Sequence, residues 1–67
     1  MIKITTIKKK REGLGLSQTE LARKLDVTQG AVSQWENGTS RPDIDSLLRL
    51  ADVFNCTIDD LIAKEVN

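Results

Sequence analysis

The side chains with the most chemistry in this chain lie between Thr28 and Gly38, in the segment TQGAVSQWENG. Gln29, Ser33 and Asn37 are spaced four residues apart, so on a helix they form one polar stripe. Amides and hydroxyls donate and accept hydrogen bonds, which suits them to recognition of a polar partner. Gly30 lies in the same stripe and weakens a helix by about 1 kcal/mol, whereas a solvated face usually carries Lys and Glu. The stripe is therefore predicted to face something other than water.

The chain offers little for catalysis or for metal binding. It has no histidine, and no group of Cys, Asp and Glu residues has the spacing of metal ligands. Its one cysteine, Cys56, cannot form an internal disulfide, and its apolar neighbours Phe54 and Ile58 favour a buried, reduced thiol. We expect no enzymatic activity, no cofactor, no metal and no small-molecule ligand.

The length of 67 residues predicts one small domain with a single core, spanning residues 1–67. No window approaches the run of about 20 apolar residues that crosses a membrane. The first ten residues lack the apolar core of a signal peptide. The expected location is the bacterial cytosol or nucleoid, with no membrane partner.

Charge is segregated along the chain although the formal net charge is zero. Up to Leu25 there are seven basic and two acidic residues, a net charge of +5. From Asp43 onward there are two basic and six acidic residues, a net charge of −4. A polyanion would therefore meet one side of the molecule, and zero net charge does not exclude nucleic acid as a partner.

Apolar spacing predicts five short helices and an all-α fold, because no stretch alternates apolar and polar residues as a strand does. The first helix is expected from about Ile4 to Gly13. The later helices are expected to begin at the capping box Ser17–Glu20, at Thr28, at Asp43 after Arg41–Pro42, and at a weaker capping box, Thr57–Asp60. The side chains expected to face inward are Ile4, Ile7, Leu14, Leu21, Ala22, Leu25, Val27, Ala31, Val32, Trp35, Ile44, Leu47, Leu48, Leu50, Ala51, Phe54, Ile58, Leu61 and Ile62.

Only three or four residues join the second helix to the third, so the two helices must cross at a steep angle. Ala22 supplies the small side chain that a close crossing needs. Val32 and Trp35 hold the third helix from behind and leave its polar stripe pointing outward. Such a helix fits the major groove of DNA, which is about 12 Å wide and admits one helix.

The segment LSQTELARKLDVTQGAVSQWENG, residues 16–38, resembles the helix-turn-helix of the lambda-type repressor and Cro family, an XRE-like DNA-binding domain. The resemblance extends over nearly the whole chain, because that five-helix domain also has a proline after this segment and a leucine-rich fourth helix. Asp26 departs from the pattern, since the family usually has glycine in this turn. Asp tolerates a positive φ better than most residues, so we expect the turn to form with some strain.

The resemblance implies contacts with double-stranded DNA. Base contacts are implied for Gln29, Gly30, Ser33 and Gln34, where Gln suits adenine and Ser donates or accepts a hydrogen bond. Phosphate contacts are implied for Arg11, Ser17, Gln18, Thr19, Asn37 and Arg41. Arg11 and Glu36 match positions that form an internal ion pair in some members. The family's dimer contact falls on Thr57, Ile58, Asp59, Asp60 and Leu61, which implies a weak homodimer on a palindromic operator.

Simpler interpretations stand beside these. Ser17 is also a helix cap, Asn37 and Arg41 also suit a solvated loop, and Lys8, Lys9 and Lys10 point in different directions around their helix. Two functions from different classes follow: a sequence-specific transcription regulator, most simply a phage- or prophage-type repressor, and a non-catalytic protein-interaction module on the same fold. The polar stripe favours the first, because a protein-binding surface more often exposes aromatic or aliphatic anchors.

Overall fold

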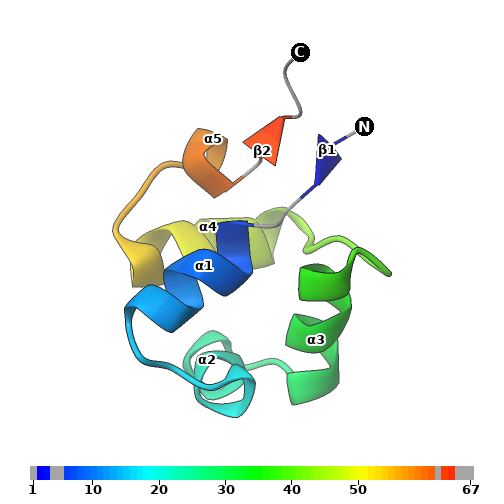
Figure 1. Ribbon diagram of the computed structural model, residues 1–67, viewed down its shortest axis with the longest axis vertical. Helices are drawn as coiled ribbons and strands as arrows, with labels where there is room; N and C mark the ends of the chain where they lie inside the picture. The colour runs from blue at the N-terminus through cyan, green and yellow to red at the C-terminus, as the bar shows by residue number, and fades with distance from the viewer. Residues whose placement is uncertain (1, 4–5, 62, 65–67) are drawn as a thin grey trace.

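The computed structural model describes residues 2–3, 6–61 and 63–64, and over them the chain forms five helices and one pair of two-residue strands. The elements in chain order are β1 (Ile2–Lys3), α1 (Thr6–Gly13), α2 (Gln18–Leu25), α3 (Gln29–Asn37), α4 (Ile44–Phe54), α5 (Ile58–Leu61) and β2 (Ala63–Lys64). Figure 1 shows α3 along one side of the molecule and β2 beside α5.

The predicted starts of the second to fifth helices are confirmed by their capping hydrogen bonds, and α1 begins at Thr6. Ser17 Oγ accepts from the Glu20 N–H at 3.0 Å, and Glu20 Oε1 accepts from the Ser17 N–H at 2.8 Å, a complete capping box. The side chains of Thr28 and Asp43 cap α3 and α4 with one bond each, accepting from the N–H groups of Ala31 and Ser46. At α5 the predicted weaker box is also present, with Thr57 and Asp60 exchanging bonds of 3.2 and 3.3 Å. These caps satisfy amide groups that a helix start leaves without intrahelical partners.

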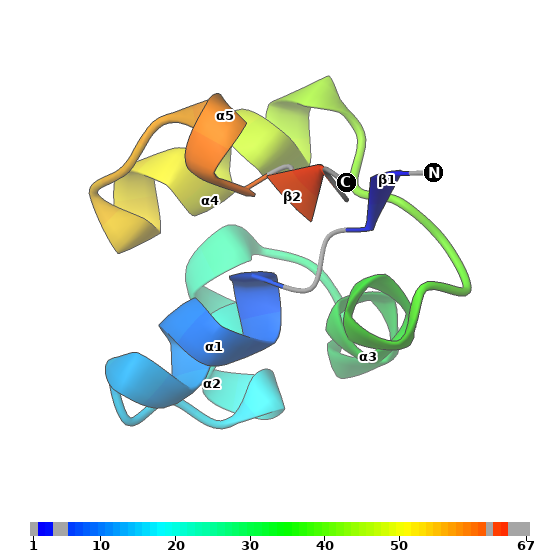
Figure 2. The same cartoon turned by 45° about the horizontal axis from the view of Figure 1, so that its top comes forward.

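The turn between α2 and α3 forms as expected despite the missing glycine. Asp26 adopts a left-handed conformation with φ 59° and ψ 43°, and the Val27 N–H donates to the Ala22 carbonyl at 3.0 Å. Arg49 of α4 adds a contact that the sequence did not predict: its Nη1 donates to the Leu25 carbonyl at 3.1 Å. A cation at the end of a helix offsets the partial negative charge of its carbonyls. The turn is thereby tied to α4. Figure 2 shows α2 and α3 on either side of the turn.

Among the described residues the buried core contains side chains from all five helices, and every one of them is among the expected inward-facing residues. Its fully or nearly buried members are Ile7, Leu21, Ala22, Leu25, Val32, Trp35, Leu47, Leu50 and Leu61. Three expected core residues are on the surface instead: Leu14 is 55% exposed, Ile44 70% and Leu48 53%. On α4, Leu47 and Leu50 already supply the side that packs inward, so Ile44 and Leu48 fall outside the covered face. Cys56 is only partly buried, and its thiol is free.

A short antiparallel strand pair joins the two ends of the described chain, with Ile2 opposite Lys64 and Lys3 opposite Ala63. The sequence gives no sign of it, because two residues per strand are too few to show an alternating pattern. The all-α prediction is otherwise confirmed. Ile4 and Ile62, expected in the first and last helices, lie outside the described residues. None of the helices described is long and apolar enough to cross a membrane.

Candidate nucleic-acid interface

The polar stripe of α3 is displayed as its sequence predicts. Val32 is fully buried and Trp35 is 6% exposed, so the back of the helix is fixed in the core. On the other side Gln29, Gly30, Gln34 and Asn37 are exposed, and Ser33 is half-buried. All four predicted base-contacting residues therefore belong to one helix whose orientation is set by two apolar side chains on its opposite face.

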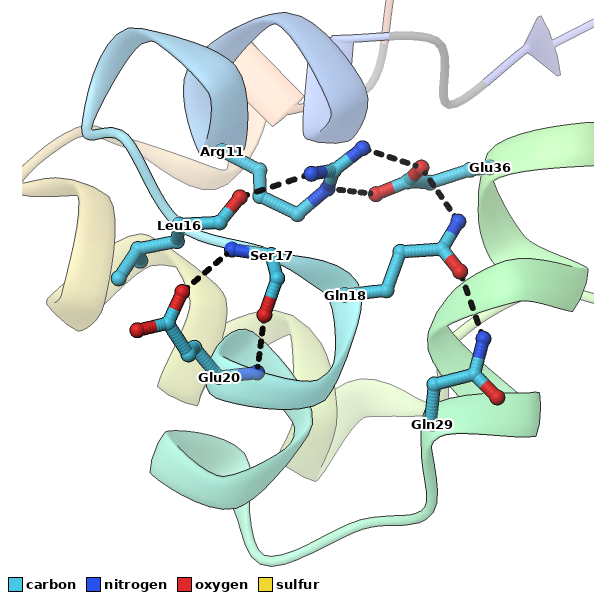
Figure 3. Close-up of polar contacts among 7 residues, drawn as sticks. All are labelled: Arg11, Leu16, Ser17, Gln18, Glu20, Gln29 and Glu36. Carbon is cyan, nitrogen blue, oxygen red and sulfur yellow. Dashed lines mark hydrogen bonds and ion pairs between the residues drawn. The ribbon is translucent and has the colours of Figure 1, made fainter.

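A chain of hydrogen bonds connects the start of this stripe to α2 and α1 (Figure 3). Gln29 Nε2 donates to Gln18 Oε1 at 2.7 Å, and Gln18 Nε2 donates to Glu36 Oε1 at 3.0 Å. Arg11 then holds the same carboxylate with two bonds, Nε to Oε2 at 2.6 Å and Nη2 to Oε1 at 3.1 Å. Its Nη1 donates to the Leu16 carbonyl at 2.8 Å. One polar network thus spans three helices and reaches the surface at Gln29.

The Arg11–Glu36 ion pair lies mostly inside the molecule, with the two side chains 11% and 5% exposed. Burial by itself raises the pKa of the Glu36 carboxyl. Hydrogen bonds from Arg11 and Gln18 and the positive charges of Arg11 and Lys8 outweigh that effect, so the pKa lies below its ordinary value. The structure gives Arg11 a clear internal role in holding Glu36, and its phosphate contact stays a prediction.

The start of α2 brings together the other polar residues predicted to contact phosphate. Thr19 is exposed and Gln18 is half-buried. The N–H of Ser17 is already taken by Glu20, which lowers the pKa of the Glu20 carboxyl and leaves Ser17 its hydroxyl proton as a donor. The interpretation of Ser17 as a helix cap is confirmed, and its phosphate contact is untested.

The loop after α3 is closed by its own side chains. Asn37 Oδ1 accepts from the Thr39 N–H at 3.1 Å and from the Thr39 hydroxyl at 2.6 Å. These bonds use the oxygen of Asn37, so its Nδ2 group is the part that can donate to a phosphate. Gln34 is engaged by the same loop, because the Ser40 hydroxyl lies 3.3 Å from Gln34 Oε1. Arg41 is exposed at the end of the loop.

The predicted dimer contact needs one correction. Thr57, Asp59 and Asp60 are exposed and Ile58 is half-buried, but Leu61 is completely buried. Leu61 packs in the domain's own core, so its side chain is not available to a second copy. Within the part of the chain that the structure describes, no group of three or more His, Cys, Asp or Glu residues could hold a metal ion.

The sequence does not predict the bonds that Gln18 makes to Gln29 and to Glu36. Eighteen positions separate Gln18 from Glu36, and nothing in local spacing signals such a contact. One clue was present: Gln18 and Gln29 each begin a helix, and a tight turn joins those two helices. Side chains at the starts of two crossing helices are the ones that the crossing can bring together.

A family model described as helix-turn-helix matches residues 7–61, which include all five helices except the start of the first. The chain belongs to the helix-turn-helix family. It is 40% identical over 55 residues to the HTH-type transcriptional activator BcrR of Enterococcus faecalis. That match covers 82% of this chain but only 27% of BcrR, so the chain spans about a quarter of its relative's length.

Solved structures place the same helix-turn-helix domain in two settings. The P22 c2 repressor bound to a synthetic operator superposes with a TM-score of 0.80 and 32% identity, over 84% of this chain and 85% of the repressor chain. A structure of HppE with cobalt(II) and substrate superposes with a TM-score of 0.77 and 31% identity, over 91% of this chain and 34% of HppE. The fold by itself therefore does not determine function, which depends on the residues of the site.

Acid should weaken the fold through Glu36. A carboxyl whose pKa is lowered in the folded state stabilises above its ordinary pKa of 4.5, and this contribution disappears as the pH falls through the lowered value. At pH 7 we expect Glu36→Gln to lower the free energy of unfolding by about 1–3 kcal/mol. The difference between the two proteins should shrink below pH 4.5, as measured by urea denaturation at several pH values.

Glu20 and Asp43 also have lowered pKa values, because each accepts hydrogen bonds at a helix start. They are unchanged in Glu36→Gln, so their contributions cancel in the comparison. A difference that stayed constant down to pH 3 would show that the charge of Glu36 does not stabilise the fold.

A substitution at Gly30 should affect the stability of the domain and its DNA binding in opposite directions. A methyl group added there would meet only Thr28 Oγ1, at an ordinary 3.9 Å, so nothing inside the protein requires glycine. Gly30→Ala should stabilise the domain by about 0.5–1 kcal/mol in thermal unfolding. If Gly30 lies against a base, the same methyl should weaken DNA binding.

Gly13→Ala is the matched control, because its added methyl meets nothing within 4 Å and Gly13 lies outside α3. It should leave DNA affinity unchanged. Equal affinities of all three proteins would remove Gly30 from the contact surface.

Proposed function

We propose that this chain binds double-stranded DNA in a sequence-specific manner and regulates transcription, as a repressor of the phage or prophage type. The observation that carries the proposal is the exposed polar stripe of α3, fixed from behind by Val32 and Trp35 and joined at Gln29 to the start of α2. The operator-bound P22 c2 repressor and the activator BcrR, both similar to this chain, support it. Residues 1–67 act as one DNA-binding domain in the bacterial cytosol.

The helix α3 enters the major groove and presents Gln29, Gly30, Ser33 and Gln34 to base edges. A bidentate contact with adenine needs one donor for N7 and one acceptor for the N6 amino group. Gln29 keeps both, because its bond to Gln18 uses only one of the two protons on Nε2. The Gln18 bond holds this side chain in place before DNA arrives, which reduces the entropy lost on binding.

Phosphate contacts come from the two ends of the stripe. Ser17, Gln18 and Thr19 lie at the start of α2, where the helix dipole favours an anion. Asn37 and Arg41 lie in and after the loop that follows α3. Arg11, although it is largely buried beside Glu36, is a further phosphate ligand. None of these contacts specifies a base, so together they position the protein on the duplex.

The regulator acts as a two-fold dimer on a palindromic operator, with half-site centres about 34 Å apart. Thr57, Ile58, Asp59 and Asp60 form the contact, and Ile58 is its one large apolar side chain. The acidic pair opposes a tight contact in free solution. The dimer is therefore weak, and it forms mainly on DNA, where a shared duplex raises the effective concentration of the second subunit.

A non-catalytic protein-interaction module is the alternative function, and one observation favours it. Ile44 and Leu48 are exposed one turn apart on α4 and give an apolar surface outside α3. On either function we propose that the chain is not an enzyme.

Selection of bound sites from random duplexes, followed by a gel shift on the selected sequence, distinguishes the two functions. A DNA-binding regulator yields a consensus and a shifted band. The absence of any enriched sequence, with Ile44→Ser and Leu48→Ser abolishing capture of a protein partner, would support the alternative instead.

Substitutions should separate base contacts from phosphate contacts. Gln29→Ala and Gln34→Ala should each weaken binding to the selected site by about 1–3 kcal/mol and relax base choice, because they remove base contacts. Arg41→Ala should weaken binding to all sequences about equally. With four to six phosphates neutralised per dimer, log K should fall with log[salt] at a slope of about −4 to −5.

Fluorescence anisotropy on the selected duplex and on random duplexes, over a range of salt concentrations, provides the measurement. A flat salt response would contradict DNA binding through phosphates. Losses of the same size on random DNA for all three variants would contradict the division of roles.

The weak dimer makes a prediction of its own. The protein should sediment as a monomer at micromolar concentration, yet bind a full palindrome about 100-fold more tightly than a single half-site. Ile58→Ser should reduce this ratio. Ile44→Ser, which changes an exposed isoleucine on another helix, should not. Equal affinities for half-site and palindrome would defeat the dimer model.

A further inference from the structure

The hydrogen bonds from Gln29 to Glu36 run in one direction only. A carboxylate accepts hydrogen bonds and cannot donate them, so the atom of Gln18 that faces Glu36 must be the Nε2 donor. The opposite end of the Gln18 amide is then Oε1, which can only accept. It accepts from Gln29 Nε2 at 2.7 Å, so the order of Gln29's own amide atoms is decided two side chains away from Glu36.

The consequence appears at the exposed end of the network. With its nitrogen turned toward Gln18, Gln29 points its oxygen away from that side chain, as Figure 3 shows. An outward oxygen accepts a hydrogen bond, and in the major groove the donors are the amino groups of adenine and cytosine. A reversed amide would point its nitrogen outward and would suit the keto oxygens of guanine and thymine.

We propose that Glu36 is a specificity-determining residue that touches no base: through Gln18 it makes Gln29 select a base with an amino group over one with a keto group. The proposal rests on the base contact of Gln29 proposed above. Glu36 suits this role because its side chain is only 5% exposed and Arg11 holds it with two bonds, so the carboxylate cannot turn away from Gln18. The lowered pKa of Glu36 keeps it ionised at neutral pH.

The test compares base preferences, which a loss of stability alone does not change. The selected duplex is varied one base pair at a time, and the position where Gln29→Ala loses its preference is the position that Gln29 contacts. At that position the wild-type protein should bind the duplex whose contacted strand carries the amino-bearing base, adenine or cytosine. Its affinity should be about fivefold to 150-fold higher than for the duplex in which that base pair is inverted. If Gln29→Ala loses no preference, both the base contact and this inference are overturned.

At that position Glu36→Gln should reduce the preference to about threefold or less, because a glutamine amide can donate as well as accept and lets the network run either way. Gln18→Ala should have the same effect by removing the link, while it leaves the Arg11–Glu36 pair in place. The double variant should show no further loss, since both changes break one pathway. Arg11→Lys is the control for a weakened ion pair: it keeps the carboxylate and one positive charge but loses the two-bond contact, so the preference should fall less than in Glu36→Gln.

If Glu36→Gln and Gln18→Ala keep the wild-type preference while Gln29→Ala loses it, this inference is wrong and the DNA-binding proposal stands. A loss of preference in Arg11→Lys as large as in Glu36→Gln would also overturn this inference, because it would assign the effect to the stability of the ion pair.

The wild-type protein gives an independent check that does not depend on the folding of a variant. In its NMR spectrum the Gln18 side-chain amide protons should show contacts with the guanidinium protons of Arg11, because both groups donate to Glu36 Oε1. Contacts of those protons with the Gln29 side chain instead would reverse the order of the network and overturn the inference.

Discussion

The two-bond pairing of Arg11 with Glu36 is the contact on which the proposed interface depends. It joins α1 to the last turn of α3, and Gln18 adds the start of α2 to the same carboxylate. Compared with a well-packed apolar pair, a buried ion pair adds little net stability, because the loss of hydration offsets the attraction between the charges; removing one partner is destabilising because it leaves the other charge unpaired. Its value lies in geometry. A guanidinium and a carboxylate satisfy each other in few arrangements, so three helices take one relative position.

The helix α3, which this contact holds, has an apolar face packed in the core and a polar face on the opposite side. Val32 and Trp35 resist any rotation of α3, since turning the helix would expose them to water. The turn before α3 is held by the left-handed Asp26 and by Arg49, and the turn after it by Asn37 and Thr39. Recognition side chains that are fixed from behind lose less freedom when they bind. The polar surface of α3 is therefore preorganised for binding.

The features that the sequence could predict depend on residues close together in the chain or on the helical periodicity of apolar residues. The caps at Ser17, Thr28, Asp43 and Thr57 were all found, because a capping residue and the amide it binds are only three positions apart. The burial of Val32 and Trp35 followed from helical spacing. The family resemblance then supplied the roles of the exposed residues, which spacing alone does not contain.

What the sequence could not predict depends on contacts between distant elements. Ile44 and Leu48 have the spacing of core residues, but whether another element covers their side of α4 is decided by the packing of the whole domain. Leu61 was assigned to a dimer contact and is buried for the same reason. The bond between Gln18 and Glu36 spans 18 positions and has no local signal. The pair β1 and β2 needs only backbone groups, so side-chain patterns do not reveal it.

We propose that α3, with the start of α2 and the loop after α3, is the surface that meets DNA. The most direct test is an NMR titration of the protein with its selected duplex. We expect the largest chemical-shift changes at the backbone amides of residues 17–19, 29–34 and 37–41 and at the side-chain amide of Gln29. Changes confined to α4, around Ile44 and Leu48, with the α3 signals unmoved, would contradict it.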